Sequence, residues 1–385
     1  MSIIHKKPER KKVFLAMGYY ERERHFGIAE YARKANWDLN SWMCHTGKLP
    51  TGKCDGIISL HCGGFHREIL DFLISHNVPT VETSVSCDEF PTPVVRFDDR
   101  VIAELAAEHF IERGFENIFF ILYGDSIIEQ QRFAAFVEVL EEKGKHCNAI
   151  NLTDLKHWKL PADKWMKNFA EIINRFPKPS AVFLENDRKA YEVCVAAKLA
   201  GIQIPEQLAV LGTDNDEIFA LTSPVPFSTI DGNLYQTGYQ AAELLDKMMQ
   251  GAQIPNQMHR VKPKGLIVRQ STDILAIPHT DTARALRYIW ENFKKPISIP
   301  DIAEAVGMSR QHLHKLFVEH LGRSMHDELL RLRLKEAKKL LRQTDTKLEA
   351  ISRQIGFSSG DRLGKIFKTK FGITPRQYRL NQKQK

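Results

Sequence analysis

Short apolar runs rich in β-branched and aromatic residues alternate with longer helical runs through the first 275 residues. "KVFLAM" precedes "HFGIAEYARKA", "CDGIISL" precedes "REILDFLISH", and "NIFFILYG" precedes "QRFAAFVEVLEEKG"; the order continues through "AVFLEND" and "LAVLGTD". This alternation predicts parallel sheets connected by crossover helices. Because 275 residues exceed what one such sheet needs, we expect an α/β body with two similar lobes.

Polar residues follow several of these apolar runs directly. Ligands of parallel α/β sheets bind outside the carboxyl ends of the strands, so these residues are the candidates for a binding site. They fall at 19–24, 98–99, 125–132, 185–187 and 214–216.

The last hundred residues have a different pattern, which occurs twice. "DIAEAVGMSRQHLHKLF" (301–317) and "EAISRQIGFSSGDRLGKIF" (349–367) each contain an apolar-spaced run, a glycine, a short polar turn and a second run. We expect Asp301 to cap the first helix, Gly307 to end it in a left-handed turn, and Ser309 to begin the next helix. The run 327–343 predicts one helix that holds both copies at a fixed separation. Helix, glycine turn and helix is the arrangement whose second helix enters the DNA major groove.

Charge is divided unevenly between the two parts of the chain. Residues 281–385 contain 23 Lys and Arg against 11 Asp and Glu, whereas the preceding residues contain 32 basic and 36 acidic groups. Charge alone fits a nucleic-acid partner and a merely soluble basic surface equally well. One glycine between two amphipathic helices also occurs in ordinary helical hairpins. Two copies in a basic segment favour DNA binding.

The C-terminal segment resembles the DNA-binding domain of the AraC/XylS family, whose closing signature is "GFSSGDRLGKIFKTKFGITPRQYR" (356–379). The resemblance implies an all-α domain at 276–385 with two helix-turn-helix units. It implies that the DNA-contacting residues are Arg310, Gln311, His314, Lys315, Gly360, Asp361, Arg362, Gly364, Lys365 and Lys368.

Two glycines in the second helix of the second helix-turn-helix copy predict that the two copies contribute unequally to base recognition. Gly360 and Gly364 have no side chain to reach a base and disfavour helix by about 1 kcal/mol each relative to alanine. They indicate close backbone approach to a neighbour or ordering on DNA. Asp361 is able to accept from a cytosine amino group, or Asp361 and Arg362 only stabilise the helix start. We therefore expect the first unit to supply most of the sequence choice.

The first 275 residues carry a second resemblance, to the effector-binding domain of LacI/GalR-type repressors, which is related to periplasmic sugar-binding proteins. It rests on "AVFLENDRKAYEVCVAAKLAGIQIPEQLAVLGTDND" (181–216), "FSTID" and "LIVRQST"; the DNA-binding head of that family is missing. The combined layout is similar to that of bacterial xylose-operon regulators. The segment "YYERERHFGIAEYAR" (19–33) resembles the N-terminal pattern of that group.

This second resemblance implies a small sugar effector and suggests the residues that bind it. Carboxylate, amide and guanidinium groups suit vicinal hydroxyls, and an aromatic ring commonly covers the C–H face of a sugar. Two alternatives stay open: the strand-end Asn and Asp cap the following helix, and Arg132 pairs with Glu129 at the surface. The ligand candidates are Arg132, Asn186, Asp187 and Asp214, with Tyr20, Phe65 or Phe133 as the aromatic cover.

These resemblances imply a cytoplasmic, sugar-responsive transcription regulator that activates pentose (xylose) utilisation genes. We expect it to bind double-stranded DNA and RNA polymerase as a homodimer, without a membrane, cofactor, metal or catalytic residues. The alternative is a two-lobed binding protein or enzyme with an accessory DNA-binding tail.

"HCGGFH" (61–66) lacks a second ligand pair at zinc spacing, and six irregularly spaced cysteines indicate reduced thiols.

Overall fold

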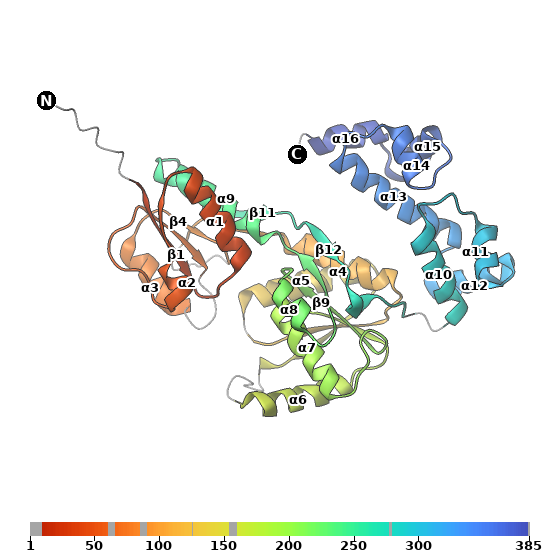
Figure 1. Cartoon of the computed structure of the whole chain (residues 1–385), viewed down its shortest axis with the longest axis horizontal. Helices are drawn as coiled ribbons and strands as arrows, with labels where there is room; N and C mark the ends of the chain where they lie inside the picture. The colour runs from red at the N-terminus through yellow and green to blue at the C-terminus, as the bar shows by residue number, and fades with distance from the viewer. Residues whose placement is uncertain are drawn as a thin grey trace. The chain divides into compact units, whose positions relative to one another are not determined.

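The computed structural model describes residues 10–60, 66–84, 91–124, 126–153, 160–276 and 279–383. The chain divides into two compact units, Met1–Glu112 with Glu116–Ile274, and Arg113–Phe115 with Leu275–Lys385. The first unit is α/β and the second is helical (Figure 1). The expected fold class, a two-sheet α/β body followed by an all-α domain, is confirmed.

The first sheet has the strand order β11-β5-β4-β3-β1-β2, and all neighbouring strands are parallel. The central strands β1, β3, β4 and β5 are buried, as expected where helices cover both faces, whereas the edge strands β2 and β11 are partly exposed. Its strands are β1 (Lys12–Met17), β2 (Asp38–Asn40), β3 (Gly56–Leu60), β4 (Thr80–Glu82), β5 (Val94–Phe97) and β11 (Met258–Val261).

The second sheet has the order β12-β10-β9-β8-β6-β7, in which only β12 is antiparallel to its neighbour. The chain crosses between the two sheets after β5, after β10 and after β11, so each lobe is assembled from distant sequence segments. Its strands are β6 (Asn117–Leu122), β7 (Cys147–Asn151), β8 (Ser180–Phe183), β9 (Leu208–Thr213), β10 (Ser228–Asp231) and β12 (Gly265–Ile267).

Nine helices of the described residues surround these sheets, as Figure 1 shows. Helices α4 and α5 pack together in the second lobe, whereas α9 packs on α1 in the first lobe. The helices are α1 (Arg22–Lys34), α2 (Trp42–Thr46), α3 (His66–His76), α4 (Asp99–Glu112), α5 (Ile127–Glu142), α6 (Ala162–Asn174), α7 (Asp187–Leu199), α8 (Glu217–Thr222) and α9 (Leu234–Met249).

Helices α1 and α9 lie side by side although two hundred residues separate them in the sequence (Figure 1). A glycine on each helix permits this close approach. A Cβ atom on Gly27 would lie 2.1 Å from the carbonyl oxygen of Tyr235, and one on Gly238 would lie 2.0 Å from that of Arg24. Both contacts are far inside van der Waals distance, so the two backbones touch only because both residues lack side chains.

The second unit contains two small hydrophobic cores joined by one long helix. The first core includes Leu313, Phe317 and Leu329, and the second includes Leu334, Leu341 and Phe367. Helix α13 contributes to both cores, as expected of the helix between the two copies. The helices are α10 (Thr280–Asn292), α11 (Ile299–Val306), α12 (Arg310–Leu321), α13 (Met325–Gln343), α14 (Leu348–Gln354), α15 (Gly360–Phe371) and α16 (Pro375–Lys383).

Candidate functional site

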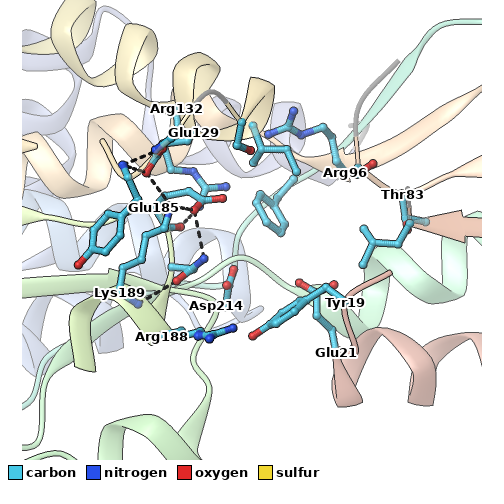
Figure 2. Close-up of a pocket in the computed structure, with 18 of the residues that line it drawn as sticks. Tyr19, Glu21, Thr83, Arg96, Glu129, Arg132, Glu185, Arg188, Lys189 and Asp214 are labelled. Atoms are coloured by element: carbon cyan, nitrogen blue, oxygen red, sulfur yellow. Dashed lines mark hydrogen bonds and ion pairs between the residues drawn. The ribbon is translucent and has the colours of Figure 1, made fainter. Parts of the chain in front are cut away.

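A cavity of about 460 Å³ opens between the two lobes of the first unit. Part of its lining comes from residues that directly follow strands: Tyr19 and Glu21 follow β1, Asn186 follows β8, and Asp214 follows β9. Figure 2 shows Tyr19 and Glu21 on one wall, Arg132 on the other, and Asp214 between them. The cavity therefore lies where the carboxyl ends of the parallel strands meet.

Arg132 lies deep in this cavity with 1% of its surface exposed. Its Nε donates to Asp99 Oδ1 at 2.9 Å, its Nη1 donates to the carbonyl oxygen of Glu185, and its guanidinium lies 5.0 Å from the ring centre of Phe97. Its Nη2 is buried and has no hydrogen-bond acceptor among the described residues. Arg132 thus has one donor group available for a ligand, and the alternative surface pair with Glu129 is not formed.

Glu129 instead belongs to a separate buried network. Its carboxylate accepts from the backbone N–H groups of Tyr123 and Gly124 and from Lys189 Nζ at 2.6 Å. Lys189 also pairs with Glu185 at 2.6 Å. Lys189 is shared between the two carboxylates, so the network shapes the cavity wall and leaves one negative charge in excess.

Asp214 presents a carboxylate that receives no hydrogen bond from the described residues, while its backbone N–H donates to Ile230. Its φ of 108° is unusual for a residue with a side chain, so the surrounding structure must hold this conformation. Burial raises the pKa of Asp214 well above its usual range, and the carboxylate of Glu21 adds to this effect. Burial also raises the pKa of Glu21, although the ion pair with Arg24 acts to lower it. Hydroxyl groups of a ligand would relieve this crowding of carboxylates by donating to them.

Asn186 and Asp187 both have structural partners. Asn186 Oδ1 accepts from the backbone N–H of Lys189 at 3.0 Å, so Asn186 caps α7, the alternative considered from the sequence; its side chain also lines the cavity. Asp187 is 1% exposed and accepts from Thr229 Oγ1 at 2.6 Å and from the Asp216 N–H at 2.7 Å. Burial raises the pKa of Asp187 to about 8. Asp187 therefore holds the loop that carries Asp214.

The predicted aromatic residues have different locations. Tyr20 lines a neighbouring cavity and not the one that holds Arg132. Phe133 packs on Phe120, in the interior of the second lobe, and Phe65 lies outside the described residues. The rings that line the cavity are those of Tyr19, Tyr123 and Phe97.

The candidate ranges predicted from the sequence include the cavity residue Arg24 but miss the cavity arginines Arg96 and Arg188. Arg96 occupies an inward position on β5, where its guanidinium pairs with Asp99 and donates to Gln131 Oε1 at 2.6 Å. Arg24 pairs with Glu21 at 2.6 Å from the first turn of α1. The signal for Arg96 was a charged residue inside the apolar run "PVVRF", directly before Asp98 and Asp99.

The second unit contains two helix-turn-helix units with the same local design. Gly307 ends α11 with a φ of 71°, and the Ser309 side chain then accepts from the N–H of His312 to cap α12. Gly356, with a φ of 79°, and the Ser359 side chain, which accepts from Arg362, repeat this design in the second copy. One expectation needs correction. Asp301 is not the cap of α11, because the helix begins earlier, at Ile299, with Pro300 in its first turn; Ser298 is the cap, and Asp301 completes a capping box with it.

Arg333 of helix α13 connects the two helix-turn-helix copies of the helical domain. Its Nε donates to the carbonyl oxygen of Phe293 at 2.8 Å and its Nη2 donates to that of Lys295 at 2.7 Å, both after α10. A Cβ atom on Gly356 would lie 2.5 Å from the same Lys295 oxygen. The turn of the second helix-turn-helix copy therefore packs against the loop that precedes the first copy. This contact fixes the separation of the two copies within the helical domain.

The predicted DNA-contacting residues divide into exposed and packed positions. Gln311, His314 and Lys315 are exposed on α12, opposite buried Leu313, Leu316 and Phe317. On α15, Asp361, Arg362, Lys365 and Lys368 are exposed and Gly364 is partly exposed, and Arg310 is exposed at the start of α12.

Gly360 differs from these residues because it is buried against α14. Its N–H donates to Glu349 Oε2 at 2.6 Å, and a Cβ atom would lie 3.2 Å from the Glu349 Cα. The structure therefore gives Gly360 a packing role between α14 and α15. Gly364 has more room, since its nearest neighbour would be Leu348 Cδ2 at 3.7 Å.

Comparison with known proteins matches both units. A periplasmic binding protein-like domain family matches residues 107–272, and a helix-turn-helix domain family matches residues 302–381. The xylose operon regulatory proteins of Haemophilus influenzae and Escherichia coli K12 are 25% and 28% identical over 96% and 95% of this chain, and over 97% and 95% of their own lengths. The chain is an AraC-type transcription regulator with a periplasmic-binding-protein-like domain.

A solved structure extends the similarity of this regulator to its whole length. The structure of the xylose-binding transcription activator XylR matches with a TM-score of 0.60 and 25% identity, covering 97% of this chain and 98% of that one. No described helix of the regulator is both long and apolar enough to cross a membrane.

Proposed function

We propose that the regulator binds a neutral pentose, D-xylose in particular, in the 460 Å³ cavity and that binding controls the attachment of its helical domain to promoter DNA. The observation that carries this proposal is that one cavity is lined by the Asp214 carboxylate, which receives no hydrogen bond from the described residues, and by Arg132, whose Nη2 has no acceptor among them. A carboxylate accepts from two vicinal hydroxyls, and a guanidinium donates to a ring or hydroxyl oxygen. The names of the relatives supply the sugar.

The charges of the cavity support a neutral ligand. Arg24 pairs with Glu21, Lys189 pairs with Glu129 and Glu185, and Asp99 lies between Arg96 and Arg132. Because these cations already have carboxylate partners, an anionic ligand would find little free positive charge, whereas the Asp214 carboxylate is left to accept from hydroxyl groups. Tyr19 and Phe97 supply the apolar surface that the C–H face of a sugar needs.

Calorimetric titration with a panel of pentoses and hexoses tests the ligand. We expect D-xylose to bind and to be recovered unchanged, because the proposal assigns binding and no catalysis to the cavity. Stereoisomers that invert one hydroxyl should bind at least tenfold more weakly, since a buried polar group then lacks its partner. Equal heats for all sugars, or none for any, would contradict the proposal.

We further propose that the regulator acts as a homodimer that activates transcription through contact with RNA polymerase. Each tail presents two helix-turn-helix units, so two chains place four recognition helices on repeated half-sites. Light scattering of the protein–operator complex should give the mass of two chains. Transcription from the promoter with purified polymerase should rise when the regulator and its sugar are added.

The two recognition helices should contribute differently to sequence choice. Gln311→Ala or Lys315→Ala removes an exposed side chain of α12 that reaches base edges, where a bidentate contact discriminates by about 1 to 3 kcal/mol. Either change should relax base preference at particular operator positions. Lys368→Ala should weaken binding to all sequences, because it removes a phosphate contact. The slope of the logarithm of the binding constant against the logarithm of the salt concentration should fall in magnitude by about one.

Operators selected from a random-sequence pool provide the measurement. Each variant is titrated against single-base operator variants at several salt concentrations. Bases under α15 that are selected as sharply as those under α12 would refute the asymmetry and assign base reading to Asp361 and Arg362.

A further inference from the structure

A second cavity of about 550 Å³ adjoins the first between the two lobes. The two cavities share Tyr19, Glu21, Asn186, Arg188 and Asp214 in their linings, so they are neighbouring parts of one cleft that meet at Tyr19 and Asp214. The first cavity continues toward Arg132 and Phe97, and the second continues toward Tyr20 and α8.

The volume of this cleft exceeds the need of one sugar. An engineered protein cavity of about 150 Å³ holds one benzene ring, so a sugar ring with its hydroxyl groups needs on the order of 300 Å³. At 460 and 550 Å³, each cavity has room for about one sugar ring and a few water molecules. A single pentose beside Asp214 and Arg132 would leave the second cavity to solvent.

The second cavity has the surface of a carbohydrate site. Tyr20 from the loop after β1, Tyr235 from α9 and Phe219 from α8 place aromatic rings on walls from both lobes. Tyr20 is 48% exposed, and Ile218 and Leu221 opposite are 67% and 71% exposed, so this apolar surface is uncovered in the ligand-free protein. Asp231 and Asn215 place polar side chains among these apolar groups. Apolar rings with interspersed hydrogen-bonding groups are the surface that binds the C–H face and the hydroxyls of a sugar.

The charge of the lining disfavours anionic ligands in this cavity. Seven carboxylates and three cationic side chains line it, so phosphorylated or carboxylated sugars would be repelled. Among the described residues, no three side chains are arranged to hold a metal ion. A second neutral sugar ring fits both the volume and the charge.

We propose that the cleft also binds a neutral oligosaccharide of at least two linked sugars, with one ring beside Asp214 and Arg132 and the next ring against Tyr20. The proposal rests on the proposed function, because it extends the pentose site by one ring. The second ring contacts Tyr20 of the first lobe and Leu221 of the second lobe, so it adds contacts that hold the lobes together.

Calorimetric titration of the full-length protein with D-xylose and with its β-1,4-linked disaccharide tests this proposal. We expect the disaccharide to bind about tenfold more tightly than D-xylose. Tyr20→Ala should remove this advantage and change the affinity for D-xylose less than twofold. Leu221→Ala, at an exposed position on the opposite wall, should reduce the advantage too, and it controls for any distortion of the loop that carries Tyr20.

The outcomes separate this proposal from the pentose site on which it rests. If D-xylose binds and the disaccharide binds no more tightly, the second ring site is refuted and the pentose site stands. If Tyr20→Ala weakens both ligands equally, Tyr20 belongs to the first ring site and the proposal is overturned. If neither ligand binds, the proposed function fails together with its extension.

Discussion

Replacement of Asp214 by alanine is expected to lower the affinity for D-xylose at least tenfold and to leave the affinity of the ligand-free protein for DNA nearly unchanged. The Asp214 carboxylate has no donor among the described residues, so sugar hydroxyls would be its main partners. Without it, those buried hydroxyls lose their acceptor, which costs about 1 to 3 kcal/mol. Calorimetry and DNA titration measure the two affinities.

A second variant separates this loss from backbone strain. Residue 214 has a φ of 108°, which alanine adopts less readily than asparagine. Asp214→Asn should therefore retain the fold and still weaken binding, since the amide offers one acceptor where the carboxylate offers two. Asp71→Ala, at an exposed residue of α3, serves as the matched control and should bind normally. Unaltered sugar affinity in both Asp214 variants would eliminate the proposed site.

Introducing alanine at Gly27 is expected to destabilise the first unit by about 3 kcal/mol or more, because overpacking of this kind forces backbone shifts. The new Cβ would lie 2.1 Å from the Tyr235 carbonyl oxygen, and α1 and α9 would have to separate. At about 2–4 °C per kcal/mol for a large domain, the melting temperature should fall by roughly 6–12 °C. Thermal unfolding followed by circular dichroism measures the shift.

Sugar affinity should also fall in the Gly27→Ala variant, since α1 places Glu21 and Arg24 at the cavity. Gly124→Ala is the control for the melting temperature alone, because a Cβ atom there meets no atom within 4 Å although Gly124 lines the cavity. A melting temperature lowered equally by both substitutions would show that the contact between α1 and α9 is not the cause.

The order of strands and helices and the two helix-turn-helix units were predictable from the sequence because they depend on local signals. Apolar runs mark the strands, and the paired signals of Gly307 with Ser309 and Gly356 with Ser359 mark the turns. The start of α11 was predicted wrongly because two acceptable caps, Ser298 and Asp301, lie three residues apart.

The interior of the cleft was less predictable because its contacts join residues far apart in the sequence. The pairing of Arg132 with Asp99 depends on how α4 and α5 are placed in space, and the sequence left a pair of Arg132 with Glu129 open as the alternative. Likewise, the packing of Gly360 against Glu349 follows from the crossing of α14 and α15. Whether a glycine is needed for close packing, as at Gly360, or has open space around it, as at Gly124, is known only from the fold.

The thermodynamic coupling between sugar and DNA tests the central claim most directly. Operator affinity is measured by fluorescence anisotropy at increasing D-xylose, and D-xylose affinity is measured by calorimetry with and without saturating operator. The account predicts that the sugar changes operator affinity at least fivefold and that the operator changes sugar affinity by the same factor, as linkage requires. If D-xylose binds the protein yet both factors equal one, the cavity does not control the DNA-binding domain and the account is wrong.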